Sequence, residues 1–155
     1  GQSVAVDSSN NLYVTGFTKG NLDGNTNAGG KDIFLIKYNS SGNKQWTKQL
    51  GTSADEQGQS VAVDSSNNIY ITGYTKGNLD GNTSAGGADI FLTKYNDDGS
   101  SVSKVWTKQF GTSGDDKGYG IATDSAGKVY VTGYTEGNLD GNTNAGGKDI
   151  FLRKF

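Results

Sequence analysis

One stretch of sequence occurs three times in this chain, and this repetition limits the folds that the chain can adopt. Residues 1–38 return at 58–95 and again at 118–155, so successive copies are offset by 57 and then by 60 residues. A repeat of this length is one supersecondary unit that buries its apolar faces against its neighbours. We therefore divide the chain into three units, residues 1–57, 58–117 and 118–155, and the third stops before its repeat is complete.

The composition of the chain argues against most enzyme classes. Its 155 residues include no Cys and no His, so a thiolate metal site, a disulfide framework and a histidine-based triad are excluded. The 25 glycines and the 32% hydrophobic content favour short strands and many turns. The net charge is −2 with no basic stripe, which argues against nucleic acid as a partner, and no apolar run is long enough for membrane insertion. We therefore expect a protein that is not an enzyme.

The beginning of the chain and its composition bear on its origin. The chain has no Met and begins at Gly1, inside the repeat pattern, so we expect a processed or partial form of a longer protein. A cysteine-free sequence rich in Gly, Asn, Ser and Thr is compatible with a prokaryotic extracellular or cell-surface protein, and we expect that location.

Each complete unit contains four predicted strands, the third unit lacks the last of them, and no helix is predicted. In the first unit the strands lie near residues 3–7, 11–17, 32–38 and 44–50. The first strand has small side chains, the next two are bulky on both faces, and the fourth places Trp46 and Leu50 on one face. This gradient from a small inner strand to a half-solvated outer strand predicts an all-β fold of β-propeller blades. Each blade is a four-stranded antiparallel sheet, and the chain encodes about 2.75 blades in tandem.

Two connections within the unit carry turn signals. Asn10 and Asn67 follow the first strand in two units, and Gly127 takes their place in the third, which predicts a left-handed backbone conformation there. The connection after the third strand has three extra residues in the second unit, through Val102 and Ser103. Because insertions are tolerated on exposed loops, we expect this hairpin to face water.

Three strings of the repeat resemble a known family. They are Val4-Ala5-Val6-Asp7, Tyr13-Val14-Thr15-Gly16-Phe17-Thr18 and Gly29-Gly30-Lys31-Asp32-Ile33-Phe34, with their copies in the second and third units. In these strings the whole chain is similar to the SBBP repeat, the bacterial and archaeal β-propeller repeat. The resemblance implies four-stranded blades in large secreted or surface proteins, with a structural or binding role.

The long loop between the second and third strands is a candidate calcium site. Loops of this length are often functional, and Asp23, Asn25 and Asn27 occupy alternate positions, like the first ligands of a calcium loop, with Asp32 as a further carboxylate. The match is partial, because Ala28 and Phe34 stand where an EF-hand has Gly and Glu. We favour a loop held by its own hydrogen bonds and keep calcium as the alternative. The candidate ligands in the other two units are Asp80, Asn82, Ser84, Asp89, Asp140, Asn142, Asn144 and Asp149.

Two further sets of side chains have both a structural and a functional interpretation. Trp46 and Trp106 could stack on sugars, but we favour packing against the next blade, since aromatic side chains dominate such interfaces. Lys37, Lys94 and Lys154 are expected to extend from a blade edge toward water.

A propeller of four to eight blades cannot close with the strands encoded here, so we expect both ends of the array to be covered by protein. The cover is either further repeats of a longer chain, a second copy that completes a ring, or copies stacked head to tail. We expect one face to contain Val4, Val14 and Leu35, and the other Tyr130, Phe151 and Leu152. Two functions stay open: a structural and interaction module, or a multivalent propeller that binds calcium or glycans.

Overall fold

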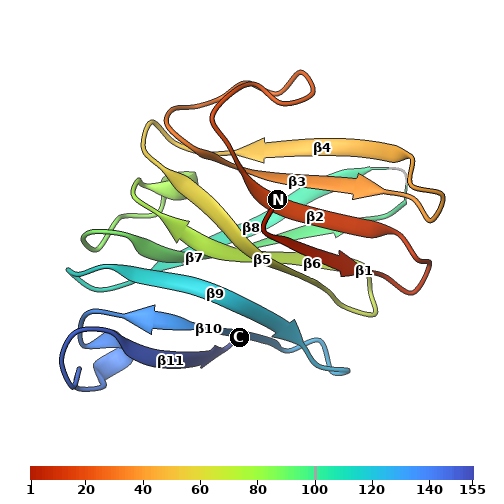
Figure 1. Cartoon of the computed structure of the whole chain (residues 1–155). Coiled ribbons are helices and arrows are strands. Elements are labelled where there is room, and N and C mark those ends of the chain that lie inside the picture. The colour runs from red at the N-terminus through yellow and green to blue at the C-terminus, as the bar shows by residue number, and fades with distance from the viewer. Residues whose placement is uncertain (100) are drawn as a thin grey trace.

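The computed structural model describes residues 1–99 and 101–155, which form three antiparallel sheets (Figure 1). The strand order is β1-β2-β3-β4 in the first sheet, β5-β6-β7-β8 in the second and β11-β10-β9 in the third. Every strand pairs with the next strand of its own sheet, which is the meander of a propeller blade. The predicted all-β fold is therefore confirmed, with two complete blades, a three-stranded third and no closure into a ring. The insertion predicted near Val102 includes Ser100, which lies outside the described residues.

The elements have the following bounds: β1 (Ser3–Val6), β2 (Leu12–Thr18), β3 (Asp32–Tyr38), β4 (Lys44–Leu50), β5 (Glu56–Val63), β6 (Asn68–Thr75), η1 (Leu79–Gly81), β7 (Asp89–Asp97), β8 (Val102–Phe110), β9 (Asp116–Thr123), β10 (Val129–Thr135), η2 (Leu139–Gly141) and β11 (Asp149–Lys154). The strands of the first sheet agree with their predicted ranges. The inner strands β5 and β9 begin two residues before the unit boundaries at 58 and 118. In the described part of the chain, no helix has the length and apolar character needed to cross a bilayer.

The three sheets stack face to face, with the first at the top of Figure 1 and the third at the bottom. Strand β5 contacts β1, β2 and β3 of the first sheet and β9 of the third, so the inner strands connect the stack. A hydrophobic core fills each blade junction, the interface between consecutive sheets. The first core contains Tyr13, Ile33, Leu35, Val61, Ile69, Ile71, Leu79, Phe91 and Tyr95, and the second contains Tyr70, Ile90, Leu92, Val129, Val131 and Leu139.

Both tryptophans pack into these cores. The ring of Trp46 lies 6.1 Å from that of Tyr13, and the ring of Trp106 lies 6.4 Å from that of Tyr70, measured between centroids. Trp46 also packs against the core that includes Ile71 of the second blade. The structure therefore agrees with packing against the next blade, the interpretation that we favoured.

The turn after the inner strand has the predicted left-handed residue. The φ angles of Asn10, Asn67 and Gly127 are 61°, 59° and 73°. Asn tolerates this region better than other residues with a side chain, and Gly enters it without steric cost, which explains the exchange of Asn for Gly between the units.

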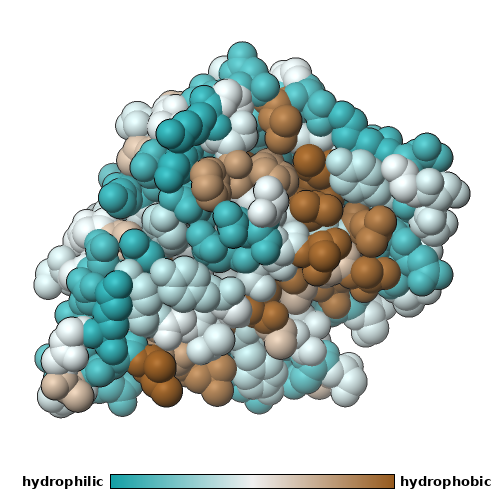
Figure 2. Space-filling view, in the orientation of Figure 1, coloured by the Kyte–Doolittle hydropathy of each residue, from teal (hydrophilic) through white to brown (hydrophobic). Residues whose placement is uncertain are grey.

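The two outer faces of the array expose apolar side chains. Val4 and Val6 of β1 are 58% and 56% exposed, and Ile150 and Leu152 of β11 are 93% and 73% exposed. Figure 2 shows hydrophobic surface over β1 and a smaller area over β11. Leu152 thus lies on an outer face as predicted.

Two residues that we placed on the outer faces lie elsewhere. Leu35 is 1% exposed, because side chains alternate along β3 and Leu35 points into the first blade junction with Tyr13. Phe151 likewise points inward and packs edge to face on Phe110, with 6.4 Å between ring centroids. The predictions for these two residues are wrong, since each is shifted by one position from the side chains that face outward.

Candidate functional site

The first ligand of the predicted calcium loop is Asp23, at the exposed tip of the loop between β2 and β3. Its backbone is left-handed, with a φ of 51°. One carboxylate oxygen pairs with Lys44 Nζ at 2.6 Å, and the other accepts a hydrogen bond of 2.5 Å from Thr47 Oγ1. These bonds from Lys44 and Thr47 hold the pKa of Asp23 below its usual value. The side chain is therefore fastened to β4 of its own blade.

The other three candidates of this loop have separate hydrogen-bond partners. Asn25 Nδ2 donates to Leu22 O at 2.8 Å, and Asn27 Oδ1 accepts from Gly29 N at 3.1 Å. Asp32 is fully buried, and its Oδ2 accepts from Ala28 N at 2.8 Å. These bonds to the loop backbone are the kind that we favoured from the sequence.

The second loop repeats this arrangement, and the third keeps the hydrogen bonds of its other three candidates to the loop backbone. In the second loop, Asp80 pairs with Lys104 and Thr107, Asn82 donates to Leu79 O, Ser84 to Gly86 O, and Asp89 accepts from Ala85 N. In the third, Asp140 pairs with Arg153, Asn142 donates to Leu139 O, Asn144 accepts from Gly146 N, and Asp149 from Ala145 N. Among the described residues, no three His, Cys, Asp or Glu side chains are grouped to hold a metal. Calcium binding by these loops stays a prediction.

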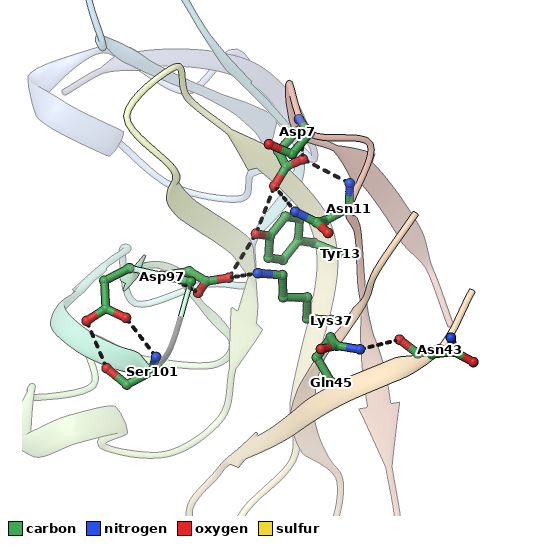
Figure 3. Close-up of polar contacts among 11 residues, drawn as sticks. Asp7, Asn11, Tyr13, Lys37, Asn43, Gln45, Asp97 and Ser101 are labelled. Atoms are coloured by element: carbon green, nitrogen blue, oxygen red, sulfur yellow. Dashed lines mark hydrogen bonds and ion pairs between the residues drawn. The ribbon is translucent and has the colours of Figure 1, made fainter. Parts of the chain in front are cut away.

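A cluster of buried charged side chains lies at the first blade junction, near the strand ends that are away from the long loops (Figure 3). Lys37 Nζ, from β3, donates to Asp97 Oδ2, from β7 of the next blade, at 2.6 Å. Tyr13 OH donates to the same oxygen at 2.9 Å and lies 3.2 Å from Asp7 Oδ2. Burial raises the pKa of Tyr13, and the adjacent Asp97 raises it further. The cluster therefore joins two blades through one shared carboxylate.

A cleft of about 340 Å³ opens beside this cluster, and Asp7, Asn11, Tyr13, Lys37 and Asp97 contribute to its wall. Within this wall, Lys37 pairs with Asp97, and Asp7 accepts hydrogen bonds from Asn11 and Tyr13.

This cluster was not predicted from the sequence. Lys37 was expected to reach water, but it is 7% exposed, and that prediction is wrong because Asp97 provides a buried partner. The sequence does contain the difference that makes this ion pair possible, since Asp97 stands in the second unit where the first unit has Ser40. Lys94 is half-buried and lies 5.5 Å from the centre of the Tyr70 ring, whereas Lys154 is exposed.

The first and second long loops also contact the linker to the next blade. Gly30 N donates to Ala54 O at 3.1 Å, and Lys31 N donates to Asp55 Oδ1 at 3.0 Å. The second loop repeats these contacts, with bonds from Gly87 N to Gly114 O and from Ala88 N to Asp115 Oδ1. The loop is therefore part of the blade junction.

The third loop has the same sequence but a different conformation. Gly146 and Gly147 have φ angles of 121° and 66°, whereas the corresponding glycines of the other loops have no positive φ. Beside this loop lies an open groove of about 450 Å³, lined by Leu139, Asp149, Phe151 and neighbouring residues. The corresponding region of the other blades is occupied by their outer strand.

Comparison with known sequences identifies the repeat. A family model described as SBBP, the beta-propeller repeat, matches residues 1–23, 45–80 and 105–140, more than half of the chain. The chain belongs to the SBBP β-propeller repeat family. The second and third matched segments each begin in the outer strand of one blade, β4 or β8, and continue through the first two strands of the next blade, so the matched repeat is offset from the blade by one strand.

Two curated proteins are similar to this SBBP chain. Regulatory protein FlaEY of Caulobacter vibrioides is 29% identical over 148 residues, which cover 88% of this chain and 15% of that protein. An uncharacterized WD repeat-containing protein of Acanthamoeba polyphaga mimivirus, L264, is 26% identical over 190 residues, with 97% of this chain and 14% of that protein covered. The chain thus spans about one seventh of the length of each relative.

Proposed function

We propose that this chain is a structural and interaction module without enzymatic activity, a propeller-repeat segment of a secreted or surface protein. Its two open faces are covered by further blades of a longer chain or by other copies. One observation carries the proposal: the third blade has a groove whose polar groups are those that the outer strand bonds in the other blades.

The outer strand of each complete blade uses one glutamine to join the long loop. Gln49 Oε1 accepts from Leu22 N at 3.1 Å, and its Nε2 donates to Asp32 Oδ2 at 2.9 Å. Gln109 makes the same two bonds in the second blade, at 2.9 and 2.8 Å. The corresponding Leu139 and Asp149 line the groove of the third blade. We therefore expect this groove to bind a strand that carries the Trp-Thr-Lys-Gln sequence of the outer strands of the other blades.

The exposed edge and faces support the same proposal. Strand β11 is the edge of its sheet, and an unpaired edge readily pairs with another strand. The apolar face formed by Ile150 and Leu152 is the face that the same residues bury in the other blades, where Ile33 and Leu35 are 2% and 1% exposed. Large exposed apolar patches typically mark interaction sites.

A peptide with the sequence of residues 44–55 tests whether the groove accepts this strand. By the register of the first blade, we expect it to pair with β11, with its Gln49 opposite Phe151 and its Leu50 opposite Ile150. Binding to the whole chain is measured by fluorescence anisotropy. Replacing Gln49 by Ala in the peptide should weaken binding about tenfold or more, since it removes a bond to the Asp149 carboxylate. A scrambled peptide that binds equally well would contradict the proposal.

The state of association provides a second test. We expect the 16.2 kDa chain to associate in a concentration-dependent manner, as measured by light scattering. Leu152→Asp should shift the population toward monomer, whereas Val105→Asp, at a position that is 52% exposed on β8, should not. A chain that stays a cooperatively folded monomer at all concentrations and binds no peptide would refute the proposal.

The near-identity of the three long loops favours a second candidate function. A multivalent propeller would use them to bind calcium or glycans, with the same side chains in each blade. Retention on a glycan array, or a calcium-dependent rise in melting temperature that Asp23→Asn abolishes, would support this function over the first.

A further inference from the structure

We propose that each blade junction binds a divalent cation of calcium type between two buried carboxylates. The pair is Asp32 and Glu56 at the first junction, and Asp89 and Asp116 at the second. This inference does not depend on whether copies of the chain assemble, because both pairs lie within one chain.

The backbone brings the members of each pair together. One is the first residue of a third strand, β3 or β7, and the other is the first residue of the next inner strand, β5 or β9. Glu56 N donates to Lys31 O at 2.7 Å, and Asp116 N donates to Ala88 O at 2.6 Å, directly beside the two carboxylates. All four side chains are 0% exposed.

A glycine leaves room for both carboxylates at the second junction and for the Asp32 carboxylate at the first. Asp116 Oδ2 lies 3.0 Å from the position that a Cβ atom on Gly111 would occupy, and Asp89 Oδ1 lies closer still. The two carboxylates of the second junction thus meet around one glycine. At the first junction, Asp32 Oδ1 takes the same place beside Gly51.

Three of the carboxylate oxygens are buried without a hydrogen-bond partner: Asp32 Oδ1, Asp89 Oδ1 and Asp116 Oδ1. The second oxygen of each of these Asp carboxylates is bonded, and both oxygens of Glu56 accept hydrogen bonds, from Thr52 and Thr75. For example, Asp116 Oδ2 accepts from Thr112 N at 2.5 Å and from Thr112 Oγ1 at 2.9 Å. Among the described residues, no Lys or Arg forms an ion pair with any of these four acids. Burying two carboxylates without a positive partner is costly, and a cation between them would offset that cost.

The donor set defines the kind of cation. Only oxygen atoms are available, which favours a hard cation, and two carboxylates balance a charge of +2. Calcium takes six to eight oxygen ligands at about 2.3–2.6 Å and accepts irregular geometry, with carbonyls and water in the remaining positions. This site differs from the predicted loop site, since it uses Glu56 or Asp116 and leaves out Asp23, Asn25 and Asn27.

Calorimetric titration of the chelator-treated chain with calcium chloride tests the proposal, and magnesium chloride provides the comparison. We expect two calcium ions per chain and weaker binding of magnesium. Asp116→Asn should remove one of the two ions, because it neutralises half of one pair. The double variant Asp23→Asn/Asp80→Asn is the matched control and should keep both ions.

Three outcomes would overturn the proposal. The first is that the unaltered chain binds no calcium. The second is that Asp116→Asn folds and still binds two ions. The third is that the control variant loses both ions, which would assign calcium to the loops. If Asp116→Asn does not fold, thermal melting of the unaltered chain decides. Ligand binding to the folded state should raise the melting temperature steadily with calcium, and an unchanged melting temperature between chelator and millimolar calcium would refute the site.

Discussion

Lys37 Nζ donates to Asp97 Oδ2 at 2.6 Å across the first blade junction, and the two side chains are 9% and 1% exposed. Each residue comes from the third strand of its own blade, so a single ion pair connects two repeats. Asp97 has no acidic counterpart in the first unit, where Ser40 takes its place. This junction is therefore specified by a difference between repeats that are otherwise alike.

The first prediction concerns this ion pair. Asp97→Asn leaves the Lys37 ammonium buried without a compensating charge, and removing one partner of a buried pair typically costs about 3–5 kcal/mol. We expect a loss of that order in the free energy of unfolding, measured by urea denaturation. The control is Lys44→Ala, which breaks the more exposed pair with Asp23 and should lower the free energy of unfolding much less. Equal losses in the two variants would contradict the role given to the cluster.

The second prediction concerns the turn beside Asp64 at low pH. Burial alone would raise the pKa of Asp64, but bonds from the Asn68 side chain and from the backbone of Asn68 and Ser66 outweigh it, so the pKa lies below the usual value of 3.8. The resulting stability is present above pH 3.8 and is lost as the pH falls through the lower folded-state value. Asn68→Ala removes the 2.8 Å bond to Asp64 Oδ2 and should cost about 1 kcal/mol at neutral pH.

Acid titration of the unfolding free energy measures this effect. The variant should lose less stability than the parent as the pH falls below 3.8. Lys128→Ala is the matched control, because Lys128 occupies the same place in the third unit and bonds Asp124 through its backbone N–H. An Asn68→Ala variant with the acid dependence of the parent would disprove the assignment.

The third prediction concerns alkaline pH. Burial, together with the charge of the nearby Asp64, raises the pKa of Tyr70 to about 12. The neutral phenol is favoured in the folded state, so its contribution is intact below the unfolded value of 10 and is lost as the pH rises from 10 to about 12. The unfolding free energy should fall across this window, and less steeply in Tyr70→Phe. Tyr119→Phe, at a ring that is 49% exposed, should keep the slope of the parent.

The fourth prediction compares one backbone position in different units. Gly127 has a φ of 73°, so Gly127→Ala forces a Cβ into the left-handed region and should lower the unfolding free energy by about 1 kcal/mol. Gly127→Asn should cost less, because Asn67 adopts a φ of 59° at the corresponding place. Denaturation of the two variants side by side checks the order, and an Ala variant as stable as the Asn variant would contradict it.

Much of the fold was predictable because the same strand and turn patterns recur in all three units. The strand ranges, the blade order and the left-handed turn at Asn10 follow from patterns that depend on near neighbours in sequence. The direction in which individual side chains point was less predictable. Leu35 and Phe151 face blade junctions rather than the outer faces, because a shift of one position in a strand reverses the side chain.

The candidate sites show the same limit. The loop residues Asp23, Asn25 and Asn27 have a spacing that indicates a calcium loop, whereas Asp97 belongs to no recognisable motif. Its importance depends on Lys37, which is 60 residues away in sequence and adjacent in space. Glu56 likewise comes near Asp32 only because its backbone N–H bonds Lys31 O once the inner strand of the next blade lies beside β3.

The two conformations of the Ala-Gly-Gly segment have a consequence for how such an array is extended. The first two copies adopt the form that bonds a following linker, and the third copy, which has none beside it, places both glycines at positive φ. One sequence therefore adopts two backbone conformations, and only one of them bonds a following linker. Adding a blade would require the preceding loop to change its backbone, while the first blade would need no matching adjustment at that segment. Extension at the two ends of such an array would therefore place different demands on the backbone.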